Sequence, residues 1–320
     1  MSSSEGGTVC SVTVGICTFR RPAMLERLLE RLADLSADGD GARKLEILVV
    51  DNDVGESGRS VVERINERAD VPLVRYVVEP EQNISIARNR VAAEASGVWL
   101  AMLDDDEFPA PGWLDHLLAM AVKTGSDGVL GPVLPHYTVP PPSWIEKGRF
   151  FEKPRLPIRA GSDLNWKQTR TSNALLSMDL FRSRGLRFDP AFGRSGGEDV
   201  DFFSHAIATG ARFVWCPDGA VYEEIGPERC RVGYLMRLGL LRGSFSRRYV
   251  GGSGFALAAG SALACGAYAA LMPLFFLLGR HVALDYVQRW CEHAGRLLST
   301  VGLDPSRERP EFRGTGDRRK

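Results

Sequence analysis

Apolar residues in the first 125 positions of the chain alternate between two spacings. Four short apolar runs are typical of buried strands: 9–17, 45–50, 73–78 and 99–103. Four intervening segments carry apolar residues every three or four positions, as on one face of a helix: a segment opened by Pro22, then 57–68, 84–95 and 113–122. Regular alternation of strand and helix predicts right-handed βαβ units, so we expect an α/β fold with a mainly parallel sheet flanked by helices.

The pattern changes after about residue 125. Positions 132–157 hold seven of the 18 prolines, three of them in a row, so we expect a long ordered loop or short strands there. Two more predicted strands, at 173–177 and 212–215, flank a helix at about 200–209. We therefore expect an α/β domain over 9–245, a disordered N-terminus at 1–8 and a disordered polar tail at 305–320.

Positions 249–279 form an uncharged stretch of 31 residues. A bilayer-spanning helix needs about 20 apolar residues. However, Gly, Ala and Ser dominate the first half, and Pro273 interrupts the more apolar run at 271–278. Three structures stay open: one spanning helix, a monotopic or re-entrant membrane contact, and a soluble helical hairpin. Four arginines before the stretch suit an anionic membrane surface: Arg237, Arg242, Arg247 and Arg248. We expect an apolar helical appendage at 246–304 that associates with the membrane or pairs with a second copy as a homodimer.

Charge and cysteine content exclude some functional classes. The 320 residues balance 40 Lys and Arg against 40 Asp and Glu, so no global positive field favours a nucleic-acid partner. The six cysteines are scattered without a CxxC pair, and we expect them to be reduced. The polar N-terminus lacks the basic and apolar regions of a signal peptide. These features predict a cytoplasmic protein, peripheral on the inner face of the cell membrane if the appendage binds there.

Polar clusters follow three of the predicted strands at the point where each strand ends. Ligands bind beyond the carboxyl ends of the strands in open parallel sheets, so these clusters are expected to converge on one crevice. They are Thr18, Arg20 and Arg21; Asp51, Asn52 and Asp53; and Asp104, Asp105, Asp106 and Glu107.

The four consecutive carboxylates at 104–107 repel one another unless water or a cation neutralises them. A hard divalent metal prefers oxygen ligands and also engages substrate phosphates, which would explain a carboxylate cluster directly after an apolar strand. An acidic surface turn is the alternative for this cluster alone. A second acidic group follows two glycines at 196–197, where Asp199 stands at the start of a helix and can cap it, act as a general base, or do both.

Five short motifs, in this order along the chain, resemble those of family 2 glycosyltransferases with the GT-A fold. They are CTFRRP at 17–22, VVDND at 49–53, NISIARN at 83–89, LDDDE at 103–107 and GED at 197–199. Each motif is weak alone, but five in order make a strong joint signal. The similarity covers about 9–243 and is greatest to bacterial exopolysaccharide glucosyltransferases of the succinoglycan type.

The resemblance implies a Rossmann-like GT-A domain with a donor site at the matching positions. The nucleotide pocket would be lined by Thr18, Arg20, Asp51, Asp53 and Arg88, with Asp51 facing the uracil. Asp104 and Asp106 would bind a divalent metal, Mn²⁺ or Mg²⁺, and with Asp105 would contact the ribose and diphosphate.

It also implies roles in the transfer step. Asp199 would be the catalytic base, and Glu198 would contact the acceptor. Asn173 would line the sugar site, and a loop after the catalytic helix would bring Arg229 and Arg231 to the diphosphate.

The implied reaction is an inverting transfer of one sugar from a UDP-sugar, UDP-glucose or UDP-GlcNAc, to a hydroxyl of the acceptor. We expect a lipid-linked saccharide as acceptor; a small secondary metabolite, such as a nucleoside antibiotic precursor, is the alternative. A noncatalytic sugar-nucleotide-binding scaffold is a rival from another class. A nucleotidyltransferase is a further rival, but it would carry a Gly-rich phosphate loop, and positions 18–22 contain arginines and no glycine.

The sequence departs from the family pattern after Asp53. Val54-Gly55-Glu56-Ser57 stands where the family normally continues with Ser or Thr, so the uracil role transfers more securely to Asp51 than to Asp53. No QxxRW motif, typical of processive synthases, follows Asp199. We therefore expect a single-addition enzyme.

Overall fold

A seven-stranded sheet organises the N-terminal part of the chain, in the order β3-β2-β1-β4-β8-β6-β9. The computed structural model describes residues 11–37, 44–68, 73–193, 196–246 and 254–303. The strands of this sheet are β1 (Ser11–Thr18), β2 (Lys44–Asp51), β3 (Val74–Val78), β4 (Trp99–Asp104), β6 (Gly128–Leu130), β8 (Ala174–Ser177) and β9 (Phe213–Trp215). β8 runs antiparallel to its neighbours β4 and β6, and the other neighbouring pairs are parallel.

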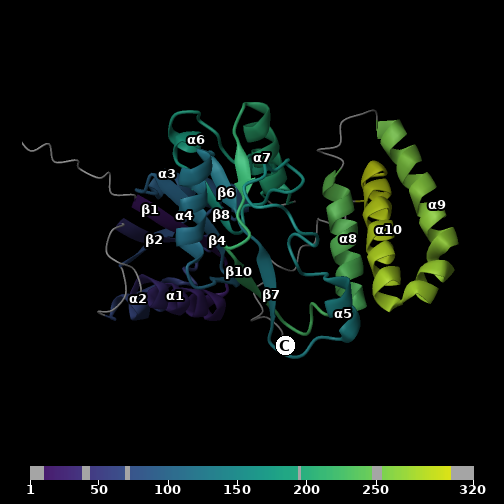
Figure 1. Cartoon of the computed structure of the whole chain (residues 1–320), viewed down its shortest axis with the longest axis horizontal. Helices are drawn as coiled ribbons and strands as arrows, with labels where there is room; N and C mark the ends of the chain where they lie inside the picture. Colours follow the sequence, from purple (N-terminus) through teal and green to yellow (C-terminus); the bar gives the residue numbers. More distant parts are fainter. Residues whose placement is uncertain (1–10, 38–43, 69–72, 194–195, 247–253, 304–320) are drawn as a thin grey trace, which may run out of the picture.

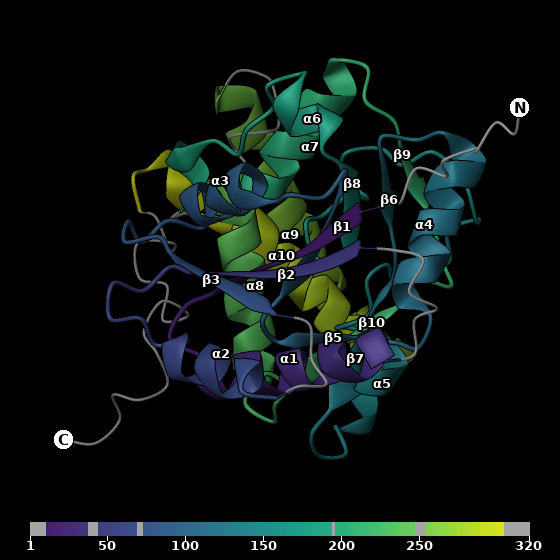
Figure 2. The same ribbon diagram turned by 90° about the vertical axis from the view of Figure 1, so that its left-hand side faces the viewer.

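Helices cover both faces of the sheet because successive strand residues point to opposite sides. In β2, Ile47 and Val49 pack against one set of helices, and Leu48 and Val50 pack against the other. Figure 2 shows α1 and α2 on one side of the strands and α3 on the other. The first set is α1 (Pro22–Ala37), α2 (Arg59–Asn66) and α4 (Trp113–Thr124); the second is α3 (Ile84–Glu94), α6 (Asp179–Arg182) and α7 (Glu198–Ala208).

A second sheet of three strands, β5 (Glu107–Pro109), β10 (Val221–Ile225) and β7 (Val133–Tyr137), begins where β4 ends. The Glu224 N–H donates to the Asp106 carbonyl at 2.9 Å, and the antiparallel register sets Glu223 opposite Glu107. This small sheet therefore carries two glutamates to the carboxyl end of β4. A short 3-10 turn, η1 (Pro190–Phe192), precedes α7.

Three C-terminal helices, α8 (Val232–Ser246), α10 (Arg280–Thr300) and α9 (Gly254–Leu278), lie side by side, with α10 in the middle (Figure 1). α5 (Ser143–Gly148) also packs on α10. An apolar cluster that includes Ile145, Leu235 and Leu284 joins these helices to the rest of the protein. Arg155 strengthens the joint, since its guanidinium pairs with Asp285 and donates to Gln288 of α10.

The structure confirms the predicted α/β fold and its helical appendage. The proline-rich segment contains β7 and α5, within the loop or short strands that its composition predicts. The strands β5, β6 and β10 were not predicted. The predicted disordered ends at 1–8 and 305–320, the start of the first strand at 9–10, and Arg247 to Tyr249 lie outside the described residues.

α9 is one continuous helix that contains Pro273. Among the described residues, α9 is the one helix whose length and composition would allow it to cross a membrane. Over Ala256–Leu278 the mean hydropathy is 1.9, and only 11% of the most apolar window is buried inside the protein. α9 is therefore unlike a core helix of a soluble domain, which would be mostly buried.

Candidate active site

The acidic cluster at the end of β4 divides into an inward and an outward part. Asp105 points inward: its carboxylate accepts from the Thr18 hydroxyl at 2.8 Å and from Arg21 Nη1 at 3.0 Å. Burial raises the pKa of Asp105, whereas Arg21 and Thr18 lower it. Asp104 faces outward, with 42% of its side chain exposed. Asp105 thus anchors the cluster to β1, and its neighbours are left to meet a ligand.

Asp106 is largely buried among other carboxylates, with 17% of its side chain exposed. Burial and the charges of Glu223, Asp105 and Asp104 raise its pKa to about 7. Arg21 Nη1 and Arg229 Nη1 both lie 3.7 Å from Asp106 Oδ2, too far for strong hydrogen bonds. A bound cation would relieve this repulsion.

Asp104 and Asp106 are the predicted ligands of a divalent metal. In the described residues no group of three or more His, Cys, Asp or Glu side chains forms a complete metal site. However, Mg²⁺ in phosphate-transferring sites is held by one or two carboxylates, and water and substrate phosphates fill the other positions. The two carboxylates match that partial donor set, and metal binding by them stays a prediction.

Glu107 and Glu223 form a second buried acidic layer behind the cluster. Burial raises the pKa of Glu223, but Lys153 Nζ at 2.7 Å and Arg229 Nη2 at 2.6 Å outweigh this effect and hold it at about 2. Burial and the nearby charge of Asp104 raise the pKa of Glu107 well above its usual value. Glu223 therefore fixes Arg229 beside Asp106.

Arg88 connects the acidic cluster to the start of α7. Its guanidinium is buried and pairs with Glu198 through Nη1 and with Asp104 through Nη2 at 3.5 Å. Asn83 and Asn89 hold the same helix: Asn83 caps α3, and Asn89 exchanges hydrogen bonds of 2.7 and 2.8 Å with the backbone of Phe188. The NISIARN motif thus ties β4 to the segment that leads into α7.

Asp199 lies in the first turn of α7, next to the Arg88–Glu198 pair. Gly196 and Gly197 have φ values of 89° and 92°, a left-handed conformation that favours glycine and turns the chain sharply into the helix. Burial and Glu198 raise the pKa of Asp199 to about 6, although Arg88 and the Val200 N–H oppose the shift. A carboxylate of this pKa accepts a proton near neutral pH, as a general base must.

The predicted nucleotide residues gather where β1 and β2 end. Arg20 is about half exposed and its Nε lies 3.3 Å from Asp53 Oδ1. Asp51, by contrast, is fully buried, and its Oδ2 accepts from the Gly58 N–H and the Tyr76 hydroxyl, both at 2.7 Å. Asp51 therefore fastens the loop before α2, and a direct contact with uracil would require these bonds to rearrange.

Asn173 is also held within the core. Its side chain is fully buried, Oδ1 accepts from Trp113 Nε1 at 2.7 Å, and Nδ2 donates to the carbonyls of Pro132 and Gly219 at 2.8 Å. Its backbone adopts a left-handed φ of 55°, which Asn tolerates better than most residues. These bonds position β8, and a sugar contact by the Asn173 side chain would require part of this network to rearrange. That contact stays a prediction.

Three residues of the site carry no signal in the motifs: Glu223, Lys153 and Arg170. Burial lowers the pKa of Arg170, whereas the charges of Glu107, Asp199 and Glu223 raise it, so Arg170 lies near both acidic groups. Glu223 alternates with the apolar residues Val221 and Ile225 along the buried face of β10. A charged residue in such a position is unusual, and this is the sequence feature that could have indicated Glu223.

Comparison with known proteins identifies the family. The family model "Glycosyl transferase family 2" matches residues 13–184. The chain is 38% identical over 228 residues to the succinoglycan biosynthesis protein ExoM of Rhizobium meliloti (strain 1021), covering 71% of each protein. It is 23% identical over 232 residues to hyaluronan synthase of Pasteurella multocida, covering 63% of this chain but only 23% of that one.

Solved structures agree on the fold. S. aureus TarS 1-349 in complex with UDP-GlcNAc superposes with a TM-score of 0.52 at 17% identity, covering 72% of this chain and 66% of that one. S. aureus TarS superposes with a TM-score of 0.53 at 16% identity, covering 90% of this chain and 55% of that one. The predicted GT-A fold and the predicted exopolysaccharide-type resemblance are thus confirmed. The chain belongs to glycosyl transferase family 2 and is a glycosyltransferase.

Proposed function

We propose that the chain is an inverting, metal-dependent enzyme that moves one sugar from a UDP-sugar to a hydroxyl of a saccharide acceptor. One observation carries this proposal: Arg88 links Asp104, at the leaving-group end of β4, to Glu198, beside the base Asp199. The groups needed on the two sides of a sugar in a single-displacement reaction are therefore held in one framework.

The donor is proposed to be UDP-glucose or UDP-GlcNAc. Thr18, Arg20 and Asp53 lie at the ends of β1 and β2, beside the acidic cluster. This arrangement suits a nucleoside diphosphate at the carboxyl edge of the sheet. The TarS complex with UDP-GlcNAc supports a UDP-sugar on this fold.

In the proposed mechanism, Asp199 accepts the proton of the acceptor hydroxyl as that oxygen attacks the anomeric carbon. The bond between the sugar and the diphosphate breaks on the opposite face, and UDP leaves. When bound at Asp104 and Asp106, the metal would supply Lewis-acid stabilisation of the diphosphate charge. Arg229, fixed by Glu223, adds a positive charge on the same side.

The rival without catalysis, a sugar-nucleotide-binding scaffold, leaves Asp199 unexplained. A half-buried carboxylate with a pKa of about 6 is unfavourable for stability and suits proton transfer. A small secondary metabolite remains the alternative acceptor, because it would need neither α9 nor a membrane.

We propose further that α9 rests on the cytoplasmic surface of the cell membrane and that the acceptor saccharide is lipid-linked. Six large apolar side chains of α9 are exposed: Leu263, Leu271, Leu274, Phe276, Leu277 and Leu278. α10 packs along α9 and carries Asp285, Arg289 and Glu292. If α9 spanned the bilayer, these charges would enter it at about 3 kcal/mol each, so an in-plane contact is favoured.

A panel of nucleotide-sugars tests the donor proposal. The purified protein is scored for thermal stabilisation with and without Mn²⁺ and for slow release of UDP. We expect one UDP-sugar to stabilise the protein in a metal-dependent way and Asp106→Ala to abolish the effect. Glu30→Ala, an exposed acid on α1, is the control. If a UDP-sugar stabilises the wild type but no UDP is ever released, the sugar-nucleotide-binding scaffold replaces our proposal. If no nucleotide or metal stabilises the wild type, the proposed UDP-sugar donor is wrong.

A further inference from the structure

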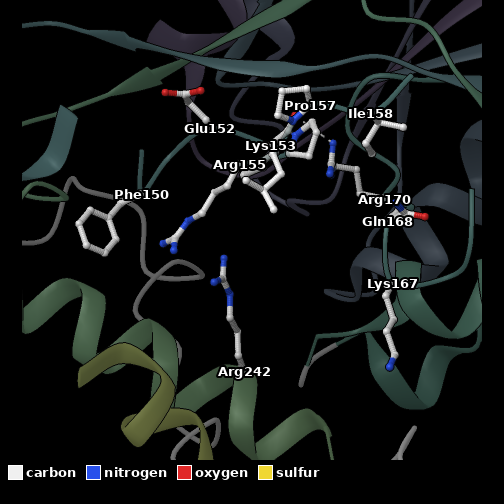
Figure 3. A pocket seen from close by; sticks show the side chains of 12 residues that line it. Phe150, Glu152, Lys153, Arg155, Pro157, Ile158, Lys167, Gln168, Arg170 and Arg242 are labelled. Atoms are coloured by element: carbon white, nitrogen blue, oxygen red, sulfur yellow. Dashed lines mark hydrogen bonds between the residues drawn. The ribbon is translucent and has the colours of Figure 1, made fainter. Parts of the chain in front are cut away.

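A cavity of about 600 Å³ lies between the segment 150–170 and α8. Its lining contains five basic side chains and a single acidic one, Glu152 (Figure 3). Glu152 is paired with Arg149, outside the cavity. The basic side chains are Lys153, Arg155, Lys167, Arg170 and Arg242.

Two of these cations are partnered by the protein, but the pocket keeps an excess of positive charge. Lys153 pairs with Glu223 and Arg155 with Asp285. For Arg170 the structure gives one hydrogen bond, from Nη1 to the Lys153 carbonyl at 3.3 Å, and no carboxylate partner among the described residues. The charges of Glu107, Asp199 and Glu223 reach Arg170, but none of these carboxylates pairs with it directly, so a ligand anion would offset the remaining cost of burying its guanidinium.

Arg155 and Arg242 approach the cavity from opposite sides, and Figure 3 shows their guanidinium ends directed toward each other. Like charges that face each other repel unless an anion lies between them. Guanidinium groups bind phosphate oxygens in pairs of hydrogen bonds. Because Asp285 and Gln288 hold the Arg155 guanidinium, Arg242 is the arginine of this pair that we expect to bind a phosphate.

The cavity adjoins the part of the candidate active site that contains Asp199 and Glu223. Arg170 feels the charges of Glu107, Asp199 and Glu223, and Lys153 binds Glu223 directly. The proposed nucleotide residues lie at the ends of β1 and β2, whereas the cavity is lined by Arg242 of α8 and by the segment before β8. α8 packs on α10, which carries the exposed apolar helix α9.

We propose that this basic cavity binds a phosphate or diphosphate group carried by the acceptor. The inference rests on the proposed transferase function and adds an anionic acceptor to it. Arg242 and Arg170 bind the phosphate oxygens, while Arg155 shapes the cavity and holds α10. The acceptor is thus fixed at a point separate from the hydroxyl that reacts.

Titration with inorganic diphosphate in the presence of EDTA tests the site without any donor or metal. We expect wild type and Asp106→Ala to bind equally, and Arg242→Gln or Arg170→Gln to bind at least about tenfold more weakly, as for loss of one charge-assisted hydrogen bond. Arg159→Gln, an exposed arginine of the same segment outside the lining, should bind like wild type. Equal binding by all variants, or binding that requires metal and Asp106, would overturn the proposal.

Two further arms identify the source of the phosphate. With one saccharide supplied with and without a diphosphate group, Arg242→Gln should raise KM about tenfold or more only for the diphosphate form. If Arg242→Gln instead loses retention on phosphatidylglycerol vesicles and binds inorganic diphosphate normally, the cavity takes lipid headgroups and our assignment is wrong. If wild type neither binds nor hydrolyses any UDP-sugar, the transferase proposal fails, and the EDTA titration still reports on the cavity by itself.

Discussion

Replacing Arg88 by Met is expected to destabilise the protein strongly, because it strands a buried carboxylate. Arg88 and Glu198 expose only 8% and 11% of their side chains, and Glu198 Oε2 already has no hydrogen-bond partner among the described residues. Removing one partner of a buried ion pair typically costs about 3–5 kcal/mol. The second contact, to Asp104 at 3.5 Å, adds little because 42% of that side chain is exposed.

Urea unfolding followed by tryptophan fluorescence measures the effect. At an m-value of about 3 kcal/mol/M, a loss of about 3–5 kcal/mol lowers the unfolding midpoint by roughly 1–1.7 M. The double variant Arg88→Met/Glu198→Gln should recover part of this loss, because Gln carries no charge to strand. We expect a coupling free energy of about 2–3 kcal/mol between the two positions, at the upper end for residues in contact.

The family resemblance assigns Arg88 a different role, a direct contact with the nucleotide. If that role were the main one, Arg88→Met would raise KM for the donor and leave the unfolding midpoint near that of wild type. Two results would refute a structural role of Arg88 between β4 and α7. One is an unchanged unfolding midpoint; the other is a double variant whose loss of unfolding free energy equals the sum of the losses in the two single variants.

Three more outcomes follow from the site and the appendage. Asp199→Asn should lower turnover by ~100-fold or more with donor binding retained. In the wild type, kcat/KM should rise with pH up to about 6 and then level, because the deprotonated Asp199 carboxylate is the active form. A flat pH profile would contradict this. Asn173→Ala should lower the free energy of unfolding in urea by about 3 kcal/mol or more, because Trp113 Nε1 and two backbone carbonyls lose their hydrogen-bond partner. A change in donor KM with an unchanged free energy of unfolding would instead support the predicted sugar contact. Leu277→Glu on α9 should reduce retention on phosphatidylglycerol vesicles about tenfold or more. Val122→Glu on α4, where the side chain is similarly exposed, should leave retention unchanged. Equal retention of the two variants would contradict the proposed membrane contact of α9.

The fold was largely predictable because long apolar runs and helical spacings mark the elements that make up the core. β1 to β4 and α1 to α4 all lie close to their predicted positions. β5, β6 and β9 have only three residues each, too few for a period of two to be recognised, although an apolar run did reveal β9. β10 was hidden because Glu223 occupies an inward position where the pattern requires an apolar residue.

The candidate site was predictable in composition but not in orientation. The motifs identify the carboxylates at 104–107, yet only the fold shows that Asp105 turns inward to Thr18 while Asp104 stays exposed. In the same way, nothing in the sequence indicates that Asp51 folds back onto Gly58. Side-chain direction depends on which backbone donors lie near, and those donors come from distant parts of the chain.

The position of α8 gives the two ends of the proposed site a common support. Near its N-terminus, Tyr234 packs against the Arg229 guanidinium, 5.6 Å from its ring, and Arg229 stands beside Asp106. Two turns later the same helix carries Arg242 into the basic cavity. The same helix therefore supports one cation beside the acidic cluster and one cation of the basic cavity.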